Sequence, residues 1–374
     1  MSLNQKIYFE NLNGLRFYCF LSVFFYHSFH TEIESIKSNE LYIFLTKSFF
    51  TNGNLGVNCF FVLSGFLITY LLLIEKTKYS NINILNFWAR RILRIWPLFY
   101  FCVFFGFVVF PELKIAFNQT PNENASYISY IFFINNFDIL NNGLPDSSIL
   151  GVLWSVAVEE QFYFIWPLII YLLPVRSFWI PFLIIIFQTF IFRFFHMNSL
   201  EQLEYHSLSC IGDMAVGGLG AWIIFHSHSF KKTIINFKKS RILLIYLFLF
   251  IFYFFRKKIS SFSDFLLIIE RLLIAIIFLF VILEQNFSKN SLFKFSKQKV
   301  FSKLGKITYG LYCLHFIGIL ISLQITRYLG LNNRLWHVVF LETALAFGLS
   351  VFISHLSYKF YELPFLKLKE KFQQ

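Results

Sequence analysis

The chain has 374 residues, of which 57% are hydrophobic and only 14% are charged, and its formal net charge is +13. Apolar stretches of about 17–25 residues recur along it, each long enough to cross a bilayer as a helix. This composition excludes an ordinary soluble domain and predicts an all-α, polytopic bundle of transmembrane helices. The cysteines are scattered singly with no CxxC pair, so they indicate neither a disulfide framework nor a zinc site: Cys19, Cys59, Cys102, Cys210 and Cys313.

We expect ten spans in one membrane domain. In chain order they cover about 12–30, 56–74, 95–110, 150–173, 177–195, 208–226, 242–255, 265–283, 304–323 and 336–357. The segment 126–140 is too short and polar to span, so we expect it to lie at the interface or to re-enter. No internal repeat is visible, which argues against a transporter built on inverted repeats.

The distribution of charge orients these spans. With the N-terminus in the cytoplasm, the loops on the cytoplasmic side sum to +17 and those on the outer side to −1. By the positive-inside rule, this asymmetry favours a cytoplasmic N-terminus, and an even number of spans then places the C-terminus in the cytoplasm too. The basic excess therefore indicates topology, and we expect no nucleic-acid partner.

The first apolar stretch, Asn11 to His30, carries Arg16 and His27. Eleven residues make close to three turns of helix, so the two side chains share one face roughly 16 Å apart. A charged residue inside a span is a functional hypothesis by default. An imidazole is the usual general base near neutral pH. The alternatives are that Arg16 is a snorkelling anchor and that His27 is an interfacial ring.

The next two stretches carry small and basic residues. Ser64 and Gly65 interrupt the apolar run GVNCFFVLSGFL, where a helix or a ligand could approach closely; plain helix packing is the alternative. Arg90, Arg91 and Arg94 precede the third span on the predicted cytoplasmic side. Guanidinium groups match phosphate oxygens, so these arginines predict a clamp for a nucleotide-containing cofactor, unless they only mark the cytoplasmic side.

The fourth stretch, LWSVAVEEQFYFIWP, holds Trp154, Ser155, Glu159 and Tyr163 near the predicted outer face. Ser155, Glu159 and Tyr163 are spaced four apart and lie along one stripe of a helix. Aromatic rings beside a carboxylate are suited to binding a sugar, because the rings stack on its apolar face and the carboxylate accepts its hydroxyls. The alternative is an aromatic belt with an interfacial acid.

Later spans carry isolated polar groups. Asp213 lies in a glycine-rich span and is as consistent with packing as with function. Glu270 and Arg271 predict an intramembrane ion pair. Tyr312 and His315 lie three residues apart and could face a cofactor tunnel, although a core histidine is an equal alternative.

Taken together, six motifs resemble acyltransferase family 3, whose members are multi-span membrane O-acyltransferases. In order they are Arg16-x10-His27, FFVLSGFL (60–67), RRILRIWP (90–97), WSVAVEEQFY (154–163), YGLYCLH (309–315) and YKFYELP (358–364). The resemblance covers the chain from end to end. It implies one acyltransferase domain over 1–374, with 358–374 as a short cytoplasmic tail, in a stand-alone form without a fused SGNH-type hydrolase domain.

The resemblance also implies a reaction and a set of roles. An acyl group, most often acetyl, would pass from cytoplasmic acyl-CoA to a hydroxyl of an extracytoplasmic surface glycan, such as lipopolysaccharide O-antigen or exopolysaccharide, across the cell membrane and without a metal. We predict that His27 and Glu159 are catalytic. The predicted acyl-CoA site comprises Arg16, Ser64, Arg90, Arg91, Arg94, Tyr312 and His315. The predicted acceptor site comprises Trp154, Ser155 and Tyr163.

Other interpretations stay open at this point. A flippase for lipid-linked sugars would need no acyl donor, and a non-catalytic scaffold would not depend on His27. Within the enzyme class, the acceptor could be a lipid, a peptidoglycan sugar or a small molecule. The sequence leaves open the acyl chain length, direct transfer as against an acyl-enzyme, and the oligomeric state.

Overall fold

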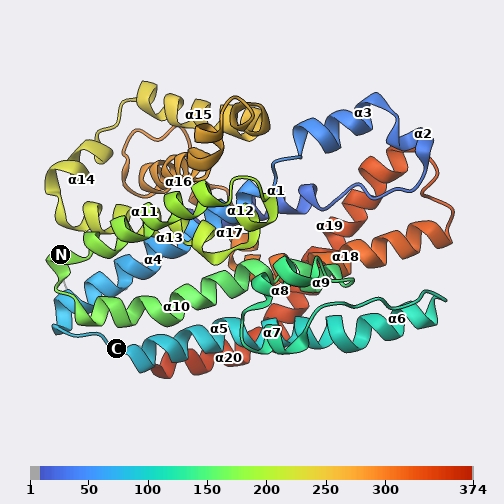
Figure 1. Cartoon of the computed structure of the whole chain (residues 1–374), viewed down its shortest axis with the longest axis horizontal. Coiled ribbons are helices and arrows are strands. Elements are labelled where there is room, and N and C mark those ends of the chain that lie inside the picture. The colour runs from blue at the N-terminus through green and yellow to red at the C-terminus, as the bar shows by residue number, and fades with distance from the viewer. Residues whose placement is uncertain (1–8, 373–374) are drawn as a thin grey trace. The chain divides into compact units, whose positions relative to one another are not determined.

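The computed structural model describes residues 9–372, which form helices and connecting loops with no strand among them (Figure 1). Eight helical segments of this described part are long and apolar enough to cross a membrane. They are Leu55–Tyr79, Ile84–Ala116, Ser148–Leu172, Val175–Phe195, Leu200–His226, Asp264–Phe287, Thr308–Tyr328 and His337–Phe372. The predicted all-α, polytopic membrane bundle is confirmed.

The predicted count of ten spans is not confirmed. Helix α1 (Asn11–Tyr26) has 16 residues, fewer than a bilayer requires. Helix α15 (Lys239–Ser260) contains the expected span 242–255 but carries basic residues towards both ends. The cytoplasmic placement of the termini stays a prediction.

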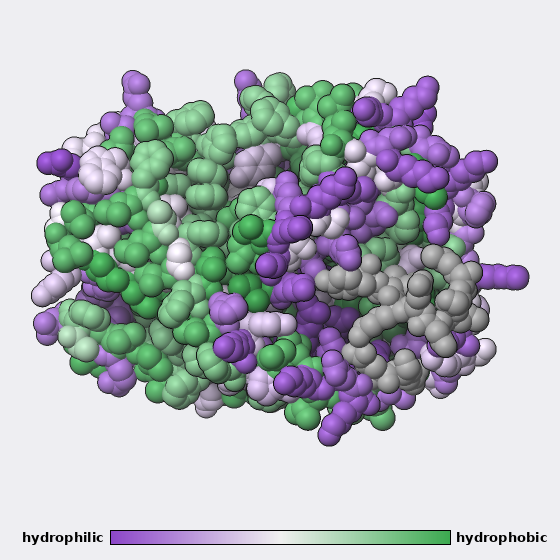
Figure 2. Space-filling model, turned by 180° about the vertical axis from the view of Figure 1, so that it is seen from behind, coloured by the Kyte–Doolittle hydropathy of each residue, from purple (hydrophilic) through white to green (hydrophobic). Residues whose placement is uncertain are grey.

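Apolar side chains cover much of the surface. Figure 2 shows one face on which hydrophobic residues predominate. Large apolar side chains stay exposed on several predicted spans: Leu172 is 78% exposed, Phe195 75% and Phe340 65%. Because such surface is unfavourable in water, this pattern is typical of helices that face lipid.

The contacts of the chain divide into two compact units. In the described part, the first comprises residues 9–17, 57–88 and 158–305, and the second comprises 18–56, 89–157 and 306–372. Five helices have residues in both units: α1, α4 (Leu55–Tyr79), α5 (Ile84–Phe104), α10 (Trp154–Leu172) and α17 (Lys299–Lys306).

The first unit is built from α4 (Leu55–Tyr79) and the helices between 175 and 306. These are η3 (Val175–Ser177), α11 (Trp179–Phe195), α12 (Leu200–Tyr205), α13 (Ser207–His226), α14 (His228–Ile235), α15, α16 (Asp264–Phe287), η4 (Phe295–Lys297) and α17 (Lys299–Lys306). Helix α4 approaches α13 closely, since a Cβ added to Gly65 would lie 1.9 Å from the carbonyl oxygen of Met214. Gly65 therefore serves helix packing, one of the two readings of its motif.

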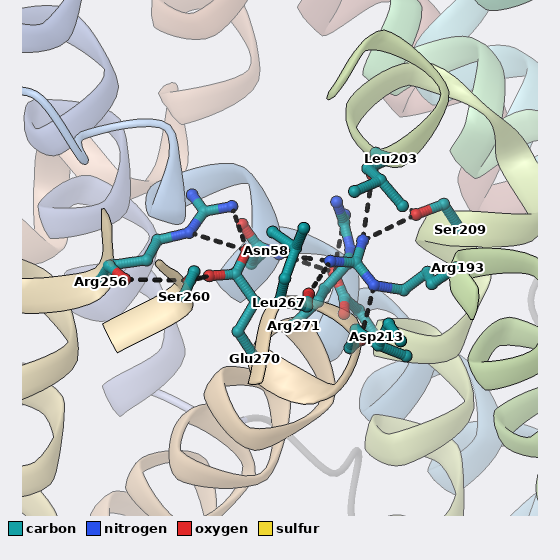
Figure 3. A network of polar contacts seen from close by, with 11 residues as sticks. Asn58, Arg193, Leu203, Ser209, Asp213, Arg256, Ser260, Leu267, Glu270 and Arg271 are labelled. Carbon is teal, nitrogen blue, oxygen red and sulfur yellow. Dashed lines mark hydrogen bonds and ion pairs between the residues drawn. The ribbon is translucent and has the colours of Figure 1, made fainter. Parts of the chain in front are cut away.

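A network of buried charges joins α11, α13 and α16 (Figure 3). Arg271 donates from Nε to Asp213 Oδ2 at 3.0 Å, and Asn58 donates to the same oxygen at 3.0 Å. Glu270 instead pairs with Arg256 at 3.0 Å and lies 3.8 Å from Arg193. The predicted Glu270–Arg271 pair is therefore wrong. Adjacent residues of a helix point about 100° apart, so each side chain finds its own partner.

Arg193 is the most fully bonded member of this network. It is 2% exposed and donates to the carbonyl oxygens of Ile268, Leu203 and Leu267 and to Ser209 Oγ, over 2.8 to 3.2 Å. A buried guanidinium is tolerated only when its donors are satisfied, so Arg193 fastens α11 to its neighbours.

The second unit contains the remaining elements. These are α2 (Glu34–Lys37), α3 (Glu40–Ile43), η1 (Phe44–Phe49), η2 (Phe105–Val109), α6 (Phe110–Ala116), α7 (Tyr127–Ile131), α8 (Asn135–Asn142), α9 (Ser148–Gly151), α18 (Thr308–Tyr328), η5 (His337–Glu342), α19 (Thr343–Leu356), η6 (Ser357–Glu362), α20 (Leu363–Leu368) and η7 (Lys369–Phe372). Helices α18 and α19 pack side by side (Figure 1). Their close approach is possible because Gly318 faces Ser350.

Two helical stretches extend beyond the expected spans. Helix α5 begins at Ile84, before the expected start of the third span at 95, so Arg90, Arg91 and Arg94 lie inside a helix. The segment expected as a tail, 358–374, is helical up to Phe372 and continues from α19. The expected interfacial segment 126–140 forms the short helix α7 and most of α8.

Candidate active site

His27 follows directly after the last residue of α1. Its backbone N–H still donates to the carbonyl oxygens of Val23 and Phe24, at 3.1 and 3.2 Å. The helix is thus unbroken from Asn11 to Tyr26, which is the condition for Arg16 and His27 to share a face.

The chain after His27 is held in a strained turn. Phe29 has a φ of 69°, a left-handed conformation that a bulky side chain rarely adopts. The Tyr42 hydroxyl donates to the Phe29 carbonyl at 2.6 Å, and the Phe29 ring stacks on Phe25 and Phe50. Such strain persists only where the surroundings enforce it, and it is often found at functional sites.

A second imidazole lies beside His27 within the same unit. The ring centroids of His27 and His315 are 5.4 Å apart. His315 is fully buried, and its Nδ1 lies 2.8 Å from the Tyr312 carbonyl oxygen. A nitrogen that bonds a carbonyl must carry the hydrogen, so we assign the proton to Nδ1. His315 Nε2 is buried without a hydrogen-bond partner and is left as an open acceptor.

Tyr312 and Ser155 form a third contact in this unit. The Tyr312 hydroxyl lies 2.7 Å from Ser155 Oγ and also donates to the Val152 carbonyl at 3.2 Å. Trp154 and Ser155, predicted to bind a sugar, are 8% and 6% exposed. Both are therefore packed inside the protein in this structure rather than presented on a surface.

The three arginines of α5 lie near the C-terminal helices. Arg90 donates from its guanidinium to the Phe372 carbonyl at 2.8 Å. Arg94 is exposed and close enough to the buried carboxylate of Glu362 for an electrostatic interaction, and Arg91 is half-buried. A phosphate group at this face would compete with the chain's own acceptors.

The first unit holds a separate cluster of three predicted site residues. Ser64 on α4 donates to Glu159 Oε1 on α10 at 3.0 Å. The Tyr163 hydroxyl lies 2.7 Å from Glu159 Oε2 and 2.9 Å from Ser64 Oγ. We call these residues the Ser64 cluster. A carboxylate that already accepts from two hydroxyls can take a proton from Ser64, the neighbouring base that a serine nucleophile requires.

Arg16 also belongs to the first unit. It is half-buried, and its guanidinium donates to Asn13 Oδ1 at 3.2 Å, one turn earlier on α1. Within residues 9–372, no group of three or more His, Cys, Asp or Glu side chains could hold a metal ion.

The sequence analysis assigned no role to one buried acid of the second unit. Glu342, at the end of η5, is 4% exposed and its Oε2 has no hydrogen-bond partner. The signal that could have found it is a single carboxylate inside the expected span 336–357.

Comparison with known proteins decides the family. The sequence pattern described as an acyltransferase domain matches residues 9–355. The chain belongs to this acyltransferase family. The predicted resemblance is therefore confirmed, and the reaction class is acyl transfer.

Several curated proteins are similar to this acyltransferase. O-acetyltransferase OatA of Staphylococcus aureus (strain NCTC 8325 / PS 47) is 35% identical over 168 residues, 44% of this chain and 25% of the relative. Putative peptidoglycan O-acetyltransferase YrhL of Bacillus subtilis (strain 168) is 35% identical over 167 residues, 43% of this chain and 23% of the relative. Peptidoglycan O-acetyltransferase OatA of Listeria monocytogenes serovar 1/2a (strain ATCC BAA-679 / EGD-e) is 35% identical over 169 residues, 44% of this chain and 24% of the relative.

In each case the matched stretch is about a quarter of the length of the relative. No solved structure matches this acyltransferase.

Proposed function

We propose that this acyltransferase moves an acetyl group from cytoplasmic acetyl-CoA to a hydroxyl of an extracytoplasmic cell-wall or surface glycan. Membership of the family supports acyl transfer, and the names of the relatives support acetyl as the group and a peptidoglycan-like glycan as the acceptor. The observation that carries the assignment of residues is the position of His27, a half-buried imidazole at the end of an intact helix.

His27 is the proposed general base. It takes the proton from the acceptor hydroxyl while the hydroxyl oxygen attacks the thioester carbon. The carbon–sulfur bond then breaks, and the imidazolium returns the proton to the departing thiolate, so no net proton is released. The ring of His315 packs next to the ring of His27.

Arg91 and Arg94 are the proposed phosphate ligands of coenzyme A. They lie one helical turn apart on α5, a spacing that allows both guanidinium groups to reach one diphosphate. Arg90, held by the Phe372 carbonyl, would border the same site. Arg16 on α1 is the fourth arginine that we propose for the handling of acyl-CoA.

The Ser64 cluster distinguishes two routes of transfer. In direct transfer the cluster holds the acceptor or the thioester, and Glu159 accepts hydrogen bonds. In a two-step route the Ser64 oxygen attacks the thioester carbon while Glu159 takes the Ser64 proton, the carbon–sulfur bond breaks, and the coenzyme A thiolate takes that proton as it leaves. An acceptor hydroxyl then attacks the acetyl ester, and its proton returns to the Ser64 oxygen. Trapping the protein with labelled acetyl-CoA and sequencing the labelled peptide separates the routes.

The function is tested with the full chain in lipid nanodiscs, isotopically labelled acetyl-CoA and an isolated glycan. We expect label in the glycan as an alkali-labile ester, together with O-acetylated glycan in cells that express the gene. Glycan that is translocated without gaining label would contradict the proposal and favour a flippase. Label in lipid or a small molecule alone would contradict the glycan acceptor.

A further inference from the structure

A small cavity lies in the second unit, between the turn after α1 and the helix pair α18 and α19, and most of its wall is apolar, with Phe29, Ile319 and Leu323 among the lining residues. Its volume is about 10 Å³, room for about one water molecule. Its polar and small lining residues are Ser28, His30, Ser322, Glu342, Thr343 and Ala346. The cavity can therefore hold a single hydroxyl group but not a sugar ring.

Glu342 supplies the strongest hydrogen-bond acceptor of this cavity. Its Oε1 accepts from the Thr326 hydroxyl at 2.7 Å, which fixes the orientation of the carboxylate. Its Oε2 is buried and has no hydrogen-bond partner. Because an unsatisfied buried oxygen is unfavourable, the site favours a ligand that donates a hydrogen bond there.

The other polar groups of the wall are acceptors as well. The Ser28 hydroxyl donates to the Phe24 carbonyl at 2.7 Å, and the Ser322 hydroxyl donates to the Glu342 carbonyl at 2.9 Å. Their hydrogens are thus used, and their lone pairs remain. A ligand in the cavity must donate, which suits an O–H group and excludes a carbonyl or a carboxylate.

The cavity is tied structurally to His27. His30 Nε2 lies 2.7 Å from the His27 carbonyl oxygen. The strained turn at Phe29, held by Tyr42, lies between the two histidines. The wall that carries Ser28 and His30 is therefore fixed relative to the proposed base, as a site that positions a substrate requires.

We propose that this cavity binds one hydroxyl of the carbohydrate acceptor and that Glu342 accepts its hydrogen bond. This contact positions a neighbouring hydroxyl of the same sugar for deprotonation by His27. The inference rests on the proposed function and adds an acceptor-binding subsite to it. A resident water has the same hydrogen-bond chemistry, and the experiment below separates the two.

The test compares Glu342→Gln with the unmodified chain in nanodiscs, using acetyl-CoA and a peptidoglycan disaccharide. Glutamine keeps the size and the bond from Thr326 but presents an amide donor to the cavity. We expect the KM for the disaccharide to rise about 10- to 100-fold, with kcat within about twofold and the KM for acetyl-CoA unchanged. Glu40→Gln, an exposed acid of the same unit, is the matched control and should change nothing.

A second variant fills the cavity instead of changing its charge. Ala346→Val places two more methyl groups at the wall and leaves Glu342 intact, so the KM for the disaccharide should rise again. Monodeoxy disaccharides, each lacking one hydroxyl, locate the contact. One of them should bind the unmodified chain more weakly than the complete disaccharide does. The same two ligands should bind Glu342→Gln equally, because the contact is already lost there. An unchanged KM in both variants would mean that the cavity holds a resident water only, and would overturn the proposal.

Equilibrium binding of the disaccharide keeps this test separate from the test of function. If the unmodified chain binds the disaccharide but transfers no acetyl group, the proposed function fails. In that case the subsite still stands if Glu342→Gln weakens binding. If binding is equal in the two proteins, the subsite is wrong whatever the activity.

Discussion

The charge network of the first unit and the polar groups near His27 in the second unit differ in how many of their buried polar atoms have partners. In the network, Arg193, Arg271, Asp213 and Glu270 are each at most 4% exposed and hold one another through ion pairs. Only Asp213 Oδ1 lacks a partner there. In the second unit, His315 Nε2 and Glu342 Oε2 are buried without a hydrogen-bond partner, and Glu342 lines a small cavity.

The difference separates structural from functional polar groups. A paired charge network fixes helices together because removing one member leaves another charge unpaired. A buried acceptor without a partner does not stabilise the fold, so we expect it where a ligand donates the missing hydrogen bond. We therefore expect substitutions in the network to change stability and substitutions near the reacting groups to change activity.

Breaking the network should have the largest effect. Arg271→Met leaves Asp213 buried without its cation, so we expect the free energy of unfolding to fall by about 3–5 kcal/mol. Thermal unfolding of the purified protein measures this loss. Arg334→Met, which removes an exposed arginine, is the control. A double variant, Asp213→Leu with Arg271→Met, should lose less than Arg271→Met alone, and a larger loss would contradict the pairing.

The Ser64 cluster tests the distinction between structural and functional polar groups. Its polar atoms are hydrogen-bonded to one another, as in the charge network, but we predict that its residues act in catalysis. We expect Glu159→Gln to lower the rate of acetyl transfer about 100-fold, since the amide cannot take a proton from a hydroxyl. Thermal stability should change little. The adjacent and buried Glu160→Gln is the matched control on the same helix. Equal loss in both variants would assign Glu159 to packing.

The arginines of α5 should affect only the donor. Replacing Arg91 and Arg94 with alanine removes two guanidinium groups, and we expect the Kd for acetyl-CoA to rise about 10-fold or more. Isothermal titration in nanodiscs measures this change, with exposed Arg176→Ala as the control. Unchanged affinity would remove the pair from the donor site.

A partly exposed ion pair should have the smallest effect. Lys114 and Asp146 lie 2.6 Å apart and are 17% and 21% exposed. Burial raises the pKa of Asp146, but the hydrogen bonds from Lys114 and the Asn122 N–H outweigh burial and hold its pKa below the usual range. The pair therefore stabilises the fold above the ordinary aspartate pKa of about 3.9, and this stability is lost as pH falls through the lower folded value.

We expect Lys114→Met to lower stability by about 1 kcal/mol or less at pH 7. The difference between the variant and the unmodified protein should shrink below about pH 4, as Asp146 becomes protonated. Thermal unfolding at the two pH values provides the comparison. A loss that is the same at both would show that the lysine stabilises through packing of its aliphatic chain.

The sequence was sufficient for features that depend on neighbours along a helix. Long apolar runs predicted the spans, and the four-residue spacing of Glu159 and Tyr163 brought their side chains together, as the 2.7 Å contact shows. The intact α1 likewise follows from a continuous apolar stretch.

Partners distant along the chain were beyond sequence reasoning. Ser64 meets Glu159 across 95 residues and Arg271 meets Asp213 across 58, and no periodicity links such pairs. We predicted Glu270 and Arg271 as partners because they are adjacent in the sequence. In a helix, however, the side chains of adjacent residues point in different directions. Glu342 was given no role because a single acid in an apolar run shows that a polar group lies in the span but not which residue it meets.

The most direct test of the central claim is a single-turnover measurement of acetyl transfer with His27→Ala. The full chain in nanodiscs is loaded with labelled acetyl-CoA, mixed with glycan and quenched over time. We expect the transfer rate to fall at least about 100-fold, with unchanged acetyl-CoA affinity and thermal stability, while exposed His228→Ala keeps the original rate. A wild-type rate in His27→Ala would contradict the assignment of His27 as the base.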